Sequence, residues 1–203
     1  MKGEDFILLF FGALFLFSII MIMGQGMRST GYATEVTTTS NVTISVYFAI
    51  ALSANLTNGI EFGTVTTLPT TNQNATDNYN GVNTTAQGTY LNGTNGTSLW
   101  TNVSTDSNTA VDFCNKADAL NTTGGDVIGL GNETYYNNTN TNYSIPAPAS
   151  EVSITTSYVK SGYNITAGSI NYYRFWLDVP AGTATGTYDN VVSFKGVAKD
   201  GVC

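Results

Sequence analysis

Four aspartates are the residues whose chemistry could support catalysis or metal binding: Asp106, Asp112, Asp118 and Asp126. Two carboxylates can hydrolyse a glycosidic bond, and carboxylate oxygens are ligands for Ca²⁺. The chain contains no histidine, which excludes a Ser-His-Asp or Cys-His triad. The spacing of the aspartates also matches no calcium-binding loop. We therefore interpret them as solvated loop acids and expect no enzyme, no cofactor and no metal; an anchored hydrolase remains only as a third hypothesis.

The chain has two cysteines, Cys114 and Cys203, which are too far apart for a CxxC zinc or redox motif. In an exported protein such a pair predicts one disulfide, and the alternative is two free thiols. Closing a loop of about 90 residues would stabilise the fold by roughly 4–5 kcal/mol in the chain-entropy model.

Asn-x-Ser/Thr sequons are more numerous than composition alone explains. Chance would give about half the observed number, because Ser and Thr together approach a quarter of the chain. We expect several to carry N-linked glycans, although Asn/Thr-rich loops also generate sequons by composition. Asn41 and Asn55 flank the first predicted strand and are expected to be partly occluded. The sequons begin at Asn41, Asn55, Asn74, Asn83, Asn92, Asn95, Asn102, Asn121, Asn132, Asn137, Asn142 and Asn164.

The charge of the chain excludes one class of partner. The formal net charge is −7 at pH 7, and only 7 residues are Lys or Arg. Binding to phosphate backbones needs clustered Lys and Arg, so nucleic acid is not an expected partner.

The elements that carry these residues are mostly β. Residues 42–52 and 170–179 are rich in β-branched and aromatic side chains, and residues 60–65 follow an Asn-Gly turn. Strands are also predicted at 151–160 and 188–198. In residues 170–179, alternation places Tyr173, Phe175, Leu177 and Val179 on the core face, opposite Tyr172, Arg174, Trp176 and Asp178.

Short strands with Gly/Pro turns predict an immunoglobulin-like β-sandwich or barrel over residues 30–203. Residues of about 70–145 are dominated by Asn, Thr, Gly and Ser, and we interpret them as a loop-rich, glycosylated insertion of that domain. The first 29 residues form a separate segment.

That segment contains the strongest hydropathy signal of the chain. Residues 6–23 carry no charge and are interrupted only by Gly12 and Ser18. A helix of this length would span roughly 27 Å, just enough for a bilayer core. It could be a cleaved secretory signal, a membrane anchor or the core helix of a filament. The acidic start disfavours a signal peptide, and Arg28 after the segment disfavours a simple anchor with an exported body.

Residues 1–23 resemble the archaeal type IV pilin and archaellin superfamily: a short polar start, Glu4 and Asp5, then an unbroken apolar run rich in Phe. The resemblance implies a long hydrophobic α-helix that waits in the membrane and then packs against its copies. An acidic residue near the start would pair with a neighbour's amino terminus. The filament-core residues would be Glu4, Asp5, Phe6, Phe10, Phe11, Phe15, Phe17, Ile20 and Met23.

These observations predict a structural subunit of an extracellular archaeal filament, type IV pilus-like or archaellum, whose partners are copies of itself. The alternative is a membrane-anchored surface or cell-envelope glycoprotein with an immunoglobulin-like binding domain. Both place the glycosylated β domain outside the cell.

Overall fold

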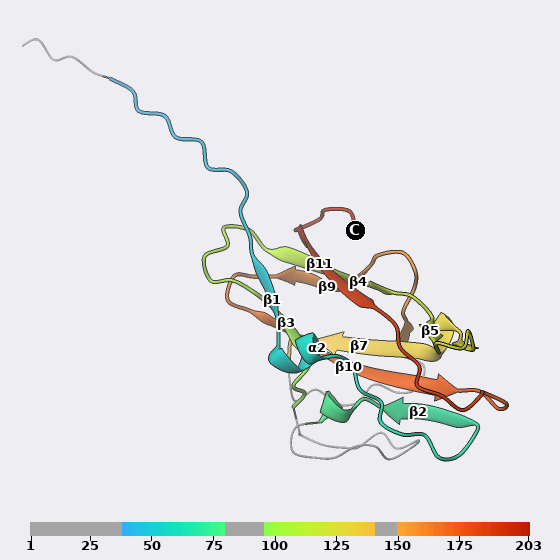
Figure 1. Cartoon of the computed structure of the whole chain (residues 1–203). Helices are drawn as coiled ribbons and strands as arrows, with labels where there is room; N and C mark the ends of the chain where they lie inside the picture. Colours follow the sequence, from blue (N-terminus) through green and yellow to red (C-terminus); the bar gives the residue numbers. More distant parts are fainter. Residues whose placement is uncertain (1–37, 80–95, 141–149) are drawn as a thin grey trace, which may run out of the picture. The chain divides into compact units, whose positions relative to one another are not determined.

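A computed structural model describes residues 38–79, 96–140 and 150–203. The chain divides into two units, residues 1–43 and 44–203. Of the first unit only residues 38–43 are described, and they are exposed and form neither helix nor strand. The second unit is mainly β-sheet (Figure 1).

The described residues of the second unit form two antiparallel sheets and a short two-stranded ribbon. The larger sheet has the order β1-β3-β10-β7-β8, and β2 pairs with the second half of β10. The smaller sheet has the order β11-β4-β9, and the ribbon pairs β5 with β6. The bounds in the larger sheet are β1 Ile50–Leu52, β2 Thr70–Asn74, β3 Trp100–Val103, β7 Glu133–Asn138, β8 Val152–Ser153 and β10 Ile170–Val179. The others are β4 Val111–Ala117, β5 Leu120–Asn121, β6 Val127–Ile128, β9 Val159–Ile165 and β11 Val192–Ala198.

The two sheets pack face to face over a shared aromatic core, as the two layers in Figure 1 show. Tyr135 of β7 and Tyr173 and Phe175 of β10 come from the larger sheet, and Phe194 of β11 comes from the smaller one. The Tyr173 ring stacks on Phe175 at 5.9 Å between centroids and meets Phe194 edge-on at 5.3 Å. Such aromatic pairs stabilise a core by more than the burial of their apolar area alone would.

Strand β10 is the centre of the larger sheet, and it coincides with the predicted strand 170–179. Its predicted core face is confirmed, because Tyr173, Phe175, Leu177 and Val179 are all buried. Alternation along a ten-residue run of aromatic and β-branched side chains is a sufficient signal for this assignment.

The opposite face of β10 is also covered, which alternation alone does not predict. Arg174 and Trp176 are fully buried there. The Arg174 guanidinium lies 4.4 Å from the ring centroid of Tyr79, and its Nε donates to the Asn78 carbonyl oxygen at 3.0 Å. Trp176 Nε1 donates to Asn74 Oδ1 at 2.7 Å. The chain from β2 through the 3-10 turn Thr76–Asn78 therefore covers this face.

The fold class predicted from the sequence is wrong. We expected a long hydrophobic α-helix followed by an immunoglobulin-like sandwich or barrel, whereas the described residues are mainly β-sheet with one short α-helix, α2 (Ala54–Asn58), and no long apolar helix. Residues 6–23, to which the long helix was assigned, lie outside the described residues. Across the described ranges, α2 is too short to cross a bilayer, and no other helix there could do so.

The strand order also differs from an immunoglobulin domain, which pairs four strands in one sheet and three in the other. Here six strands share one sheet, with β10 contacting β3, β2 and β7. Periodicity reports which side of a strand is buried, but it carries no information about which distant strand lies beside it.

Three further expectations require correction. Of the predicted buried strand 42–52 only β1 is a strand, and residues 42–47 are exposed. Residues 60–65 form no strand, because the preceding Asn-Gly ends α2 instead of making a hairpin turn. The region of about 70–145 contains β2 to β7 in its described parts, so it belongs to the sheets more than its polar composition suggested.

Candidate functional site

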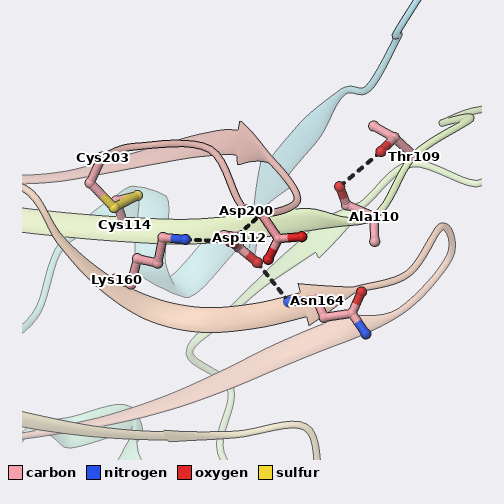
Figure 2. A network of polar contacts seen from close by, with 8 residues as sticks. All are labelled: Thr109, Ala110, Asp112, Cys114, Lys160, Asn164, Asp200 and Cys203. Carbon is pink, nitrogen blue, oxygen red and sulfur yellow. Dashed lines mark hydrogen bonds and ion pairs between the residues drawn. A yellow bond between two sulfur atoms is a disulfide. The ribbon is translucent and has the colours of Figure 1, made fainter.

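Of the four aspartates, only Asp112 lies in a polar network (Figure 2). Its carboxylate is buried on β4, where Lys160 Nζ of β9 lies 2.7 Å from Oδ2. The backbone N–H groups of Asn164 and Asp200 donate to Oδ1 at 2.7 Å and to Oδ2 at 3.0 Å. Burial alone would raise the pKa of Asp112, but the hydrogen bonds from Lys160, Asn164 and Asp200 outweigh it and hold the pKa below the ordinary value. Asp112 is therefore a fixed anion that ties three segments together.

The other three aspartates, Asp106, Asp118 and Asp126, are exposed. Asp106 follows β3, Asp118 follows β4 and Asp126 precedes β6. Within the described residues, no group of three or more acidic, Cys or His side chains could hold a metal ion.

The predicted disulfide between Cys114 and Cys203 is confirmed, with Cα atoms 6.0 Å apart across a sequence separation of 89. Figure 2 shows the disulfide beside the Asp112 network, and Cys114 lies on the same strand as Asp112, β4. Lys195 Nζ of β11 donates to the Cys203 carbonyl oxygen at 2.7 Å. The bridge, Lys195 and the Asp200 contact to Asp112 together fasten the last residues of the chain to the smaller sheet.

A buried carboxyl that the sequence did not single out is Glu133, the first residue of β7. It is 1% exposed; its Oε2 accepts a 2.6 Å hydrogen bond from Asn190 Nδ2, and Oε1 has no hydrogen-bond partner among the described residues. Burial raises the pKa of Glu133 to about 7, although the Asn190 hydrogen bond acts in the opposite direction. No sequence signal distinguishes Glu133, because its burial depends on Asn190, 57 residues away.

A groove of about 990 Å³ lies beside the first half of β11. Its walls are residues 57–65, the end of β10, the ribbon β5–β6 and residues 183–191. Among its described lining residues only Glu61 and Asp189 are charged. Asn190, which holds Glu133, is part of the wall. The apolar lining residues include Leu52, Phe62, Val65, Leu177, Val192 and Phe194.

The sequons are distributed between surface and interior. Three of the asparagines are exposed: Asn41, Asn121 and Asn164. Asn41 was expected to be partly occluded and is not. Four are half-buried: Asn55, Asn102, Asn132 and Asn137. The remaining predicted acceptors, Asn83, Asn92, Asn95 and Asn142, lie outside the described residues.

Asn74 is the exception among the described sequons. It is fully buried, and its Oδ1 accepts the indole N–H of Trp176. A glycan on Nδ2 would need space that the packed core does not contain. From this burial we expect Asn74 to carry no glycan in the folded protein.

The predicted filament-core residues, Glu4, Asp5, Phe6, Phe10, Phe11, Phe15, Phe17, Ile20 and Met23, all lie outside the described residues. No protein-family model matches the chain, and no curated protein matches it significantly. A functional conclusion consequently depends on the residues themselves.

Proposed function

We propose that this chain is a structural subunit of an extracellular archaeal filament, of the type IV pilus or archaellum kind. The observation that carries the proposal is the apolar segment of residues 6–23, which has no charged residue. Burying such a segment against copies of itself removes apolar surface from water, which is the main driving force of protein association. The membrane would hold the segment before assembly.

The β unit supports an extracellular location. The Cys114–Cys203 disulfide is of the kind that persists in oxidising compartments. The exposed sequons of Asn121 and Asn164 offer acceptors for N-linked glycans on the surface of residues 44–203. Both features suit a unit that covers the outside of an assembly.

A non-enzymatic role is supported by the chemistry of the acidic residues. The chain has no histidine, and the Asp112 carboxylate is fully engaged by Lys160 and two backbone N–H groups. Glu133 is buried and its Oε2 is engaged by Asn190.

The second candidate is a membrane-anchored surface or cell-envelope glycoprotein with a binding β domain. It is favoured by residues 44–203 forming a compact unit with its own cores and disulfide. In that case the apolar segment would remain in the lipid and the unit would act alone.

Mass spectrometry of the mature protein separates the two candidates. The filament proposal expects residues 6–23 to be intact in chain recovered from a sheared, detergent-resistant extracellular fraction. Removal of the segment by cleavage beyond Gly24 would refute the proposal. Recovery only from detergent-extracted membranes, as a monomer, would establish the anchored glycoprotein.

A further inference from the structure

The segment of residues 42–47 has the pattern of a buried strand but is exposed. Val42, Ile44 and Val46 alternate with Thr43 and Ser45, as in a strand with one apolar face. These three side chains are 84%, 77% and 67% exposed. A row of β-branched side chains left in water marks a surface that another element covers.

Hydrogen bonds within residues 44–203 hold the second half of this segment against residues 104–108. Asn108 Nδ2 donates to the Ser45 carbonyl oxygen at 2.8 Å, and Tyr47 N–H donates to Asn108 Oδ1 at 2.8 Å. The Ala49 carbonyl oxygen accepts from Ser104 N–H at 2.9 Å. These bonds fix residues 45–49 at the end of β1 opposite Leu52, which is the β1 residue that lines the groove.

The groove offers what an added strand requires. Strand β11 is an edge of its sheet, since it pairs with β4 alone among the described strands. An edge strand presents unpaired N–H and C=O groups to an incoming chain. Val192 and Phe194 of this strand line the groove.

The chemistry of the segment and the groove agree. Residues 38–60 contain no charged residue, so residues 42–47 can leave water without desolvating an ion. The groove is lined by apolar residues such as Phe62 and Phe194 together with polar ones, and about 990 Å³ is at the upper end for a small-molecule cleft, which leaves room for several side chains. An extended peptide binds such a site by backbone pairing, and alternate side chains enter the pockets.

We infer that residues 42–47 of one copy add as a strand to the free edge of β11 in a second copy, with Ile44 and Val46 entering its groove. This inference rests on the proposed function and names the contact between subunits outside the apolar segment. Donor segment and acceptor groove are different surfaces, so the contact is head-to-tail. A head-to-tail contact that does not close into a ring extends into a filament.

Cysteine cross-linking of the full-length chain tests the register. Ile44→Cys is made in one chain and Val191→Cys, beside the groove and 65% exposed, in another. The native cysteines are already paired, so they do not compete. Mixing the two variants under mild oxidation should give a disulfide-linked dimer. The control partner is Val159→Cys, which is 41% exposed on β9 at the other edge of the same sheet. Equal linkage to both partners, or linkage to neither, overturns the inference.

Assembly of the double variant Ile44→Asp/Val46→Asp gives a second test. It should raise the concentration needed for assembly by about 100-fold or more, because two apolar side chains can no longer be buried. Val159→Asp is the matched control and should assemble normally. If the wild-type chain assembles and the double variant assembles equally well, the inference fails and the filament proposal stands. If the wild-type chain forms no extracellular assembly at all, both fail.

Discussion

The buried carboxyl of Glu133 should make the protein less stable as the pH rises from about 4.5 to about 7. Its pKa is about 7 in the folded protein, against an ordinary value of 4.5, because burial disfavours the charged form. Between these values the folded chain binds a proton that the unfolded chain has lost, so the contribution of Glu133 to stability is complete below pH 4.5 and falls above it. At about 1.4 kcal/mol per pH unit, the difference amounts to about 3 kcal/mol.

The measurement is the free energy of unfolding of the full-length chain in urea, at pH values from 4.5 to 8 in one non-ionic detergent. Glu133→Gln keeps an acceptor for Asn190 but cannot ionise, so its stability should change about 3 kcal/mol less than that of the wild type over this range. Glu61→Gln, at an exposed carboxyl, is the control and should behave like the wild type. If wild type and Glu133→Gln show the same pH dependence, burial of Glu133 does not control its ionisation and the reasoning is refuted.

Other predictions follow from the remaining contacts. Lys160→Met leaves the buried Asp112 with two backbone donors and should lower the free energy of unfolding by about 2 kcal/mol; an unchanged urea midpoint would show that the pair adds nothing. Glycopeptide mapping of the native protein should find glycan on Asn164 and none on Asn74, and occupied Asn74 would contradict its burial. Phe11→Asp should abolish extracellular filaments while circular dichroism shows the β unit still folded; normal filaments would disprove burial of the apolar segment.

The parts of the fold that the sequence predicted correctly are those set by local pattern. Alternation alone was sufficient for β10 and for its core face, since Tyr173 and Phe175 repeat with the period of a strand. The disulfide was predicted from the number of cysteines, because an exported chain with two cysteines can form only one intramolecular bridge. Neither inference required knowledge of which elements lie side by side.

The features that were missed all depend on contacts between distant segments. Arg174 was expected on the polar face of β10, yet its guanidinium is buried against Tyr79 and the Asn78 carbonyl, about 95 residues earlier. Glu133 owes its environment to Asn190 in the same way. Strand pairing and the cover over a second sheet face are set by the whole chain, so residue periodicity cannot reveal them.

The prediction for residues 42–47 failed for a different reason. The alternation of apolar and polar residues is real, but the apolar side chains are exposed and not buried in the domain core. Their alternation predicted one apolar face, and the sequence analysis assigned that face to the core of the same domain. In the structure Ile44 and Val46 are exposed, while the edge strand β11 contributes Val192 and Phe194 to the lining of a groove. Alternation of apolar and polar residues indicates that one face of a strand is covered. It does not indicate whether the covering surface belongs to the same molecule. A strand signal whose apolar side chains stay exposed in their own molecule is expected of a segment that a neighbouring copy covers.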